Sequence, residues 1–353
     1  MRCRAAFAVA LILQSSIAMA ADVSEPFSIR KQMHLMAPQA MAELVGASLT
    51  HLGTRLTLAP PQVEPAETAA AIVHFCGGLG AEHSDMVAVT RRISRAEFRR
   101  CVENGVTDVV EIAIGYDAAV LVTKAEVPPM LLTSEQIFRA LARDLPSNNG
   151  FVPNVAKTWN DVDRTLPSLD IRVVTTGRGT AARSLLEDKV LQAGCRNLPE
   201  IRAIYAADSR VARCVTPRGD GRLVEVATPE AALALLDASP PGAVAVIPQQ
   251  QAEMTGQRYQ RISVDGMLPS GESIRSREYP LSRRLYYYFK VGHMRDRKGY
   301  GVASNLRELM DDAVGEAAVG PDGYFTAAGL VPLEEGERTR QRRAAAALVP
   351  MER

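Results

Sequence analysis

Residues 170–195 combine the features of a site for a small anion. A β-branched run at 171–174 predicts a short buried strand, and a turn with two glycines leads from it into a helical pattern at 181–192. Thr180 can cap that helix, whose free N–H groups and positive dipole end attract anions. Arg183 stands in the first turn, where a cation opposes the dipole unless an anion visits. An ordinary strand-to-helix connection is the alternative interpretation of the same pattern.

A metal site is a further alternative, because His74-x-Cys76 and His83-x-Asp85 supply possible ligands. Cys76 is better explained as half of a disulfide. The remaining histidines form no ligand spacing: His34, His51 and His293. The chain also has no G-x-S-x-G elbow and no paired Ser/His/Asp signature. The sequence therefore predicts no metal, no cofactor and no enzymatic activity.

The N-terminus predicts export. Arg2 and Arg4 precede an apolar run at 5–17, and Ala-Met-Ala at 18–20 is typical of a cleavage site. A signal anchor is the alternative. No later segment is long and apolar enough to cross a membrane. We therefore expect residues 1–20 to be a cleaved signal peptide and the mature protein to be periplasmic.

Charge and length narrow the class of protein. Without Arg2 and Arg4, the 41 basic residues of the 353-residue chain fall to 39, against 40 acidic residues, so the mature net charge is −1. This balance gives no indication of a nucleic-acid surface. About 330 mature residues suggest two domains or one large one.

The mature chain keeps four cysteines, which fits an oxidising compartment, where an even count favours disulfides. We favour the sequence-near pairing, one of three possible, because each bond would tie a helix or turn to its next neighbour: Cys76–Cys101 and Cys195–Cys214.

Strands and helices alternate along the chain, which indicates parallel sheets flanked by helices. Ligands of such α/β sheets bind at the carboxyl ends of strands. Three turns are therefore expected near a common cleft, at 33–38, 85–92 and 175–183. From Glu334 the chain becomes charged and low in complexity, and we expect residues 338–353 to form a mobile tail.

Several segments, taken in order, resemble a known family. The chain is similar to the periplasmic phosphate-binding proteins of ABC importers, a branch of the type II solute-binding proteins. The resemblance covers roughly residues 29–337, and its motifs are CGG at 76–78, Asp85 with TR at 90–91, IGYD at 114–117, YPLSRRLY at 279–286, GPDGY at 320–324 and AGLVPL at 328–333.

The resemblance implies a two-lobed Venus-flytrap fold whose lobes are joined by two hinge strands. The crossings would lie near 112–116 and 243–248. Lobe one would hold residues 21–114 and 247–337, and lobe two residues 115–246. A small anion would bind between the lobes, closure would bring both lobes onto it, and the closed receptor, a monomer, would dock on an inner-membrane permease.

The resemblance also implies a set of ligand positions, and about half of its donors are missing here. The first turn has His34 and Leu35 in place of hydroxyls. The second offers Thr68 beside Glu67, and the third keeps its cation as Thr90-Arg91. The fourth, at the helix start in 170–195, reads Thr180-Ala181-Ala182-Arg183.

Two functions remain open on the sequence alone. The first is a receptor for phosphate or a related phosphonate, carboxylate or other small acid. The second is a receptor-like protein that has lost phosphate binding and recognises another ligand or a protein partner. The alanines at 181 and 182 motivate the second, because each unmet acceptor of a dehydrated anion costs about 1–3 kcal/mol.

Overall fold

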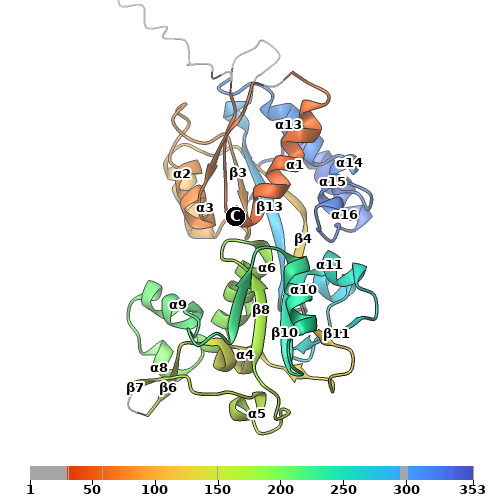
Figure 1. The fold of residues 1–353 in the computed structure, drawn as a ribbon. Coiled ribbons are helices and arrows are strands. Elements are labelled where there is room, and N and C mark those ends of the chain that lie inside the picture. The colour runs from red at the N-terminus through yellow and green to blue at the C-terminus, as the bar shows by residue number, and fades with distance from the viewer. Residues whose placement is uncertain (1–29, 31, 58, 149, 295–300, 353) are drawn as a thin grey trace, which may run out of the picture.

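The computed structural model describes residues 30, 32–57, 59–148, 150–294 and 301–352, so the expected signal peptide lies outside the described residues. The chain forms two lobes, one above the other in Figure 1, which share a single mixed sheet. Its strand order is β2-β1-β3-β13-β4-β10-β8-β9, and β11 pairs with β4.

Lobe one contains the first four strands of that order and the first part of β4. Helices α2 and α3 cover one face of its sheet, and α1 with α13–α16 cover the other (Figure 1). Its elements are β1 (His34–Ala37), η1 (Gln39–Met41), α1 (Ala42–Gly53), β2 (Gln62–Pro65), α2 (Thr68–Phe75), β3 (Met86–Val89), α3 (Arg95–Glu103), β4 (Val109–Lys124), β13 (Ser282–Lys290), η3 (Val291–His293), α13 (Leu306–Ala313), α14 (Glu316–Val319), α15 (Tyr324–Ala327) and α16 (Glu335–Ala346).

Lobe two is built on the second part of β4, with β10 and β8 beside it. Its elements are β5 (Leu131–Leu132), α4 (Ser134–Leu141), β6 (Asp144–Ser147), β7 (Gly150–Pro153), α5 (Trp159–Val162), β8 (Arg172–Thr176), α6 (Ala181–Leu185), η2 (Leu186–Leu191), α7 (Gln192–Cys195), α8 (Pro199–Arg202), α9 (Ala207–Val215), β9 (Leu223–Val226), α10 (Pro229–Ala238), β10 (Ala243–Pro248), α11 (Gln249–Met254), β11 (Tyr259–Arg261), β12 (Ser263–Val264) and α12 (Gly271–Ser276).

Strand β13 explains why the lobe-one sheet is buried on both faces. Its side chains alternate between two apolar cores, as the period of two in a strand requires. Tyr286 and Tyr288 pack with α2 and α3, whereas Leu285, Tyr287 and Phe289 pack with α1 and α13.

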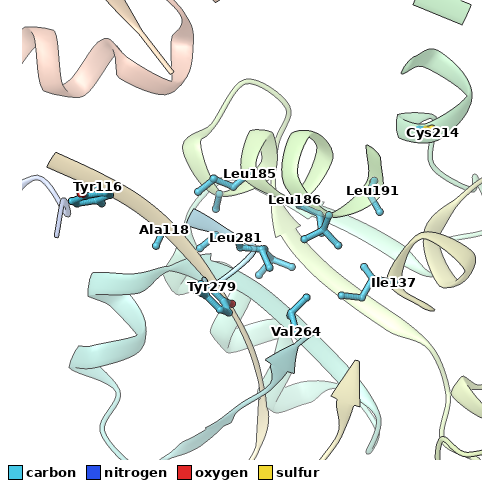
Figure 2. Close-up of a cluster of buried hydrophobic side chains, with 14 of the residues drawn as sticks. Tyr116, Ala118, Ile137, Leu185, Leu186, Leu191, Cys214, Val264, Tyr279 and Leu281 are labelled. Atoms are coloured by element: carbon cyan, nitrogen blue, oxygen red, sulfur yellow. The ribbon is translucent and has the colours of Figure 1, made fainter. Parts of the chain in front are cut away.

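The junction of the lobes is formed by β4 and β13. The two strands pair antiparallel from Val109 to Ala118, and the register shifts between Leu285 and Tyr286. Gly115 lies at this irregularity with a φ of 147°, and a Cβ there would stand 3.1 Å from Leu330. A single apolar cluster continues across the junction from Tyr116 to Tyr279 (Figure 2).

The second crossing, where the chain returns from lobe two to lobe one, does not lie at its predicted position of 243–248. That segment is β10, which pairs with β8 and with residues 119–122 of β4, wholly inside lobe two. The chain stays with that sheet through β11. The return is made by β13, because its Ser282–Lys290 run is the one that pairs with β4 across the junction.

The expected mobile tail is instead a packed helix. Arg338 of α16 donates to the carbonyl of Leu333 at 2.7 Å, and its side chain is largely buried. The backbone N–H of Met351 donates to Val109 of β4 at 2.8 Å. Buried Ala345 and Met351 anchor a segment whose composition is otherwise charged, which is the physical reason for the difference.

The predicted disulfide pairing is confirmed: Cys76 bonds to Cys101 and Cys195 to Cys214. Among the residues that the structure describes, no helix combines the length and the apolar character needed to cross a membrane.

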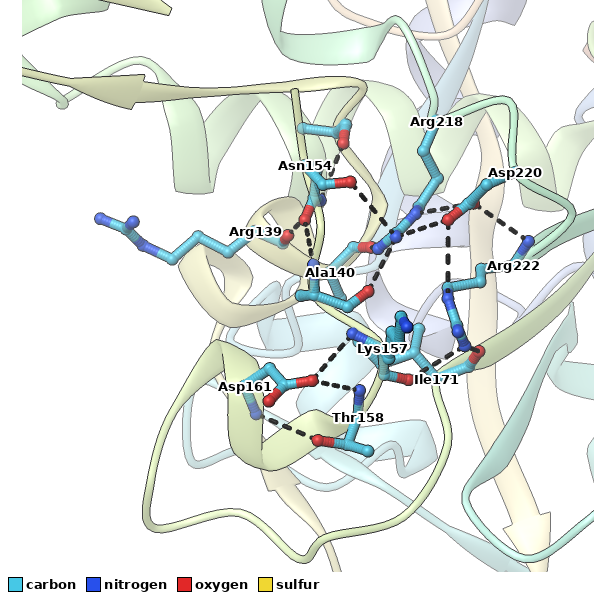
Figure 3. A network of polar contacts seen from close by, with 12 residues as sticks. Arg139, Ala140, Asn154, Lys157, Thr158, Asp161, Ile171, Arg218, Asp220 and Arg222 are labelled. Carbon is cyan, nitrogen blue, oxygen red and sulfur yellow. Dashed lines mark hydrogen bonds and ion pairs between the residues drawn. The ribbon is translucent and has the colours of Figure 1, made fainter. Parts of the chain in front are cut away.

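A buried arginine organises the far end of lobe two (Figure 3). Arg218 is 5% exposed and forms a two-pronged ion pair with Asp220 at 2.6–2.8 Å. It also donates to the carbonyls of Ala140 and Ala156 at 2.9 and 2.7 Å. All its nitrogen atoms are thus hydrogen-bonded within the fold, so Arg218 has a structural role.

Candidate functional site

A cavity of about 520 Å³ opens where the two lobes meet. We call it the junction cavity. It is bounded by the turn after β3, the start of β13, η2 and the end of α12. Its lining consists of Thr90, Arg91, Arg92, Lys189, Ser276, Arg277, Pro280, Ser282, Arg283, Arg284 and Tyr286. Six of these side chains are basic and none is acidic, so the cavity favours anions.

Four of the six basic side chains form ion pairs with carboxylates that do not line the cavity. Arg91 donates to both oxygens of Glu97 at 2.8 and 2.7 Å, and this hydrogen-bonded pair lowers the pKa of Glu97 to about 2. The other three pairs are Arg92 with Glu111, Arg284 with Glu337, and Arg283 with Asp117.

Lys189 and Arg277 differ from the other four. Neither side chain has a hydrogen bond or an ion pair with any residue in the described part of the chain, so both are available to a ligand. Partial desolvation of the Lys189 ammonium, followed by the neighbouring Arg283, lowers the pKa of Lys189, although the residue as a whole is exposed. Arg277 follows α12 in a left-handed conformation with a φ of 64°, a position where glycine is usual.

Of the predicted site residues, Thr90 and Arg91 line the junction cavity. Thr68 supports them, since its hydroxyl lies 3.0 Å from that of Thr90 and accepts the Thr90 N–H at 3.2 Å. These contacts hold the turn after β3 in place and aim it at the junction.

The helix start in lobe two does not join this set. Thr180 caps α6, and its hydroxyl also contacts Thr176 at 2.7 Å. Arg183 is completely buried and pairs with Glu187 at 2.8 Å and Glu225 at 3.4 Å. It lines neither of the two cavities at the junction. The spacing of Arg183 and Glu187, four residues apart on a helix, was the sequence signal for this pairing.

The first predicted turn also lies elsewhere. Leu35 belongs to the lobe-one core, so its side chain offers nothing to an anion. His34 is buried beside it, and its Nε2 lies 3.1 Å from a Glu64 oxygen. Both residues sit within β1 rather than at its carboxyl end, which explains why they do not reach the junction.

A second cavity of about 320 Å³ shares the junction and has the opposite charge. We call it the acidic cavity. Three carboxylates line it, from Glu43, Asp117 and Glu230, together with Ala181, and the described lining contains no basic residue. Ala182 is buried next to it in α6. The Asp117–Arg283 ion pair separates the two cavities, because Asp117 lines one and Arg283 the other.

The residues considered as metal ligands are engaged otherwise. Cys76 is in a disulfide. Asp85 accepts hydrogen bonds from Arg30 at 2.6 Å and from the His34 N–H at 2.6 Å, and lies 2.7 Å from His293 Nδ1. Within the described ranges, no three His, Cys, Asp or Glu side chains are grouped to hold a metal ion.

Sequence reasoning missed Lys189, Arg277, Arg283 and Arg284 as site residues. A signal existed, because four arginines occur within ten residues at 275–284. Part of the same stretch, YPLSRRLY at 279–286, served the prediction only as a family motif, and its residues from Ser282 onward belong to β13.

Comparison with known proteins supports the fold. A family model described as a PBP superfamily domain matches residues 38–304. A possible phosphate binding protein from Planctomyces limnophilus DSM 3776 is 15% identical with a TM-score of 0.68, over 91% of this chain and 100% of that chain.

Two other solved structures are similar at lower scores. PstS from Borrelia burgdorferi is 13% identical with a TM-score of 0.53, over 82% of this chain and 95% of that chain. An ABC-type phosphate transport receptor from Vibrio cholerae is 14% identical with a TM-score of 0.52, over 81% of this chain and 95% of that chain. No curated protein sequence matches the chain. The predicted α/β fold of a two-lobed type II periplasmic binding protein is confirmed.

Proposed function

The chain belongs to the PBP superfamily, and from that premise we propose that it is a periplasmic solute-binding protein that binds phosphate or a related small oxyanion between its lobes. The observation that carries this proposal is the junction cavity, lined by six basic side chains contributed by both lobes. Hydrogen bonds from charged donors to phosphate oxygens are short and strong. The proposed ligand is therefore matched by the chemistry of the cavity.

In the proposed site, each lobe contributes side chains that bind the ligand. Thr90 and Arg91 would bind from lobe one, with Thr68 orienting Thr90. Lys189 and Arg277 would bind from lobe two. A ligand held by both sides stabilises the arrangement in which the lobes are together, which is the usual basis of hinge closure in two-lobed receptors.

The proposed cellular role is that of a monomeric receptor that delivers its ligand to an ABC permease and performs no catalysis. The similarity to a receptor described as an ABC-type phosphate transport receptor supports this role. The leader pattern at 1–20 and the two disulfides support a periplasmic location, where disulfides persist.

Isothermal titration of the purified protein with phosphate tests the proposal. We expect binding, and we expect the double variant Lys189→Gln/Arg277→Gln to weaken it by roughly tenfold or more, about 1.4 kcal/mol. The matched control is Arg196→Gln/Arg202→Gln, which removes two charges from a separate cavity of lobe two and should leave the affinity unchanged.

Two results would contradict the proposal. Absence of heat and of a thermal shift at millimolar phosphate would favour the alternative, a receptor-like protein that has lost phosphate binding. Equal loss in the control variant would place the anion outside the junction cavity.

A further inference from the structure

The loop between α2 and β3 carries three of the residues that the sequence singles out and that the junction cavity does not use. It comprises residues 77–84, and we call it the glycine loop because it opens with two glycines. Three histidine rings form a row beside it, from His34 on β1 through His74 on α2 to His83 in the loop. Their ring centroids are 5.3 Å apart for the first two and 5.5 Å apart for the last two.

The glycine loop is folded back on its own start. The His83 ring lies against Gly77 and Gly78, where a Cβ atom would stand 2.5 and 3.0 Å from ring atoms. Side chains at these two positions would displace the ring, which explains the two glycines. Arg30 donates to the His83 carbonyl at 3.0 Å, and a Glu82 oxygen lies 3.4 Å from His83 Nε2.

The start of the glycine loop is held by β13 and by η3, which follows it. The buried Lys290 ammonium donates to the carbonyl of Gly78 at 2.7 Å. His293 Nε2 lies 3.0 Å from the carbonyl oxygen of Leu79. The end of the loop, at Ser84, is attached to α2 instead.

His74 makes that attachment, and its geometry fixes the protonation state of the ring. The backbone N–H of Ser84 donates to His74 Nδ1 at 3.2 Å. Because the backbone group is a donor, Nδ1 has to be the unprotonated nitrogen, so the neutral ring carries its hydrogen on Nε2. Ser84 is completely buried, so its N–H depends on this acceptor.

Protonation of His74 removes the acceptor. An imidazolium carries a hydrogen on both nitrogens and accepts no hydrogen bond. The Ser84 hydroxyl, 3.4 Å from His74 Nδ1, can take the new hydrogen, but the Ser84 N–H is then left without a partner. The closed loop and a charged His74 are therefore incompatible.

The groups around His74 oppose its protonation. Partial burial, followed by the neighbouring His34 and His83, lowers the pKa of His74 from its ordinary value of 6.5. Lys290 on β13 acts in the same direction, and Glu64 on β2 acts against it. Strand β3 brings no titratable side chain to α2, and α3 meets α2 through a disulfide.

The direction of the pH dependence follows from this lowered pKa. When the loop opens, His74 regains its ordinary affinity for a proton, so the open loop binds more protons than the closed loop. The closed loop is thus fully stable above about pH 6.5 and becomes less stable as the pH falls below that value.

We propose that His74 is a pH-sensitive latch of the glycine loop: its neutral ring holds Ser84, and its protonation in acid releases the loop from α2. The inference goes beyond the proposed function, because it concerns a different part of lobe one and involves no ligand. Phosphate titrations can succeed or fail without affecting it.

Hydrogen–deuterium exchange of the mature, disulfide-intact protein tests the latch. Exchange is measured at about pH 8 and at about pH 5 and corrected for the intrinsic rate of each amide. We expect the corrected exchange of residues 77–84 to rise roughly tenfold or more in acid, while the strands of lobe one remain protected.

Two variants separate the latch from a general effect of acid. In His74→Asn the side-chain oxygen stands near the place of Nδ1 and accepts the Ser84 N–H without titrating, so the acid-induced rise should disappear. The matched control is His51→Asn, which removes a histidine of α1 that contacts Asp312, outside the row. This control should keep the rise.

Three results would overturn the inference. The first is corrected exchange of the loop that is equal at both pH values in the wild-type protein. The second is an undiminished rise in His74→Asn. The third comes from nitrogen NMR of the wild-type imidazole rings, which decides the matter even if His74→Asn does not fold: a hydrogen on His74 Nδ1 at about pH 8 contradicts the proposed acceptor.

Discussion

The junction of the two lobes holds two cavities of opposite charge, divided by one ion pair. The junction cavity is lined by six basic side chains and the acidic cavity by three carboxylates. Strand β13 borders the junction cavity and β4 borders the acidic cavity, and the two strands are paired at the junction. The difference in charge comes mainly from the turns and helices around the strands, which supply cations to the junction cavity and Glu43 and Glu230 to the acidic cavity. It identifies the junction cavity as the one suited to an anion.

The largest effect on stability is expected when the ion pair between Arg283 and Asp117, which separates the two cavities, is broken. Arg283 donates to Asp117 at 2.9–3.0 Å and to Ser184 at 2.8 Å, and both partners of the ion pair are buried. Arg283→Met should lower the free energy of unfolding by about 3–5 kcal/mol, because a buried carboxylate is left unpaired. Urea denaturation measures this change.

The double variant Arg283→Met/Asp117→Leu is the control, because it removes both charges. It should recover much of the lost stability. A double variant as unstable as Arg283→Met would show that the arginine acts through packing rather than through its charge.

Reversing one charge in each cavity tests directly which of the two cavities binds phosphate. Arg277→Glu places a carboxylate in the junction cavity and should reduce phosphate affinity by roughly a hundredfold, since like charges at a binding site cost several kcal/mol. Glu230→Lys makes the mirror change in the acidic cavity and should leave the affinity within about threefold. Equal responses in calorimetric titrations would mean that the anion does not distinguish the cavities.

A smaller effect, an increase in phosphate affinity, is expected when Arg91 no longer pairs with the Glu97 carboxylate. Glu97→Gln removes the charge that competes with an incoming anion, so phosphate affinity should rise by roughly threefold to tenfold. Glutamine also serves at the third position of a capping box, so the cap that Ser94 provides for α3 is preserved. An unchanged or lower affinity would indicate that Arg91 does not contact the ligand.

The same pair predicts a modest dependence of stability on pH. Its folded pKa, about 2, lies below the ordinary value of 4.5, so Glu97 stabilises the fold fully above pH 4.5 and loses that contribution as pH falls toward 2. The wild-type protein should therefore lose more stability over this range than Glu97→Gln does. Parallel acid denaturation curves would contradict the pairing.

Local patterns in the sequence predicted much of the fold, because they depend on near neighbours. The alternating strands and helices and both disulfides depend on short spacings. The charged composition after Glu334 was misleading, since two buried residues, Ala345 and Met351, suffice to anchor that segment.

The site was harder to predict because its residues are far apart in the chain. Thr90 and Lys189 are separated by 99 positions, and only the packing of the lobes brings them to one cavity. A helix start with an arginine predicted an anion at Arg183, but Glu187 one turn later binds the Nε of that buried side chain, while its two terminal nitrogens have no hydrogen-bond partner among the described residues. The sequence shows which residues can bind an anion, and their partners decide which of them are free to do so.

The most direct test of the central claim is a crystal structure of the protein grown with arsenate, located by its anomalous scattering. Arsenate has the shape and charge of phosphate. The account predicts a peak in the junction cavity, within hydrogen-bonding reach of Thr90, Lys189 and Arg277. A peak in the acidic cavity, at the α6 start beside Thr180 or in the separate cavity at Arg196 and Arg202 would contradict it, as would the absence of any arsenate peak in crystals grown at millimolar arsenate.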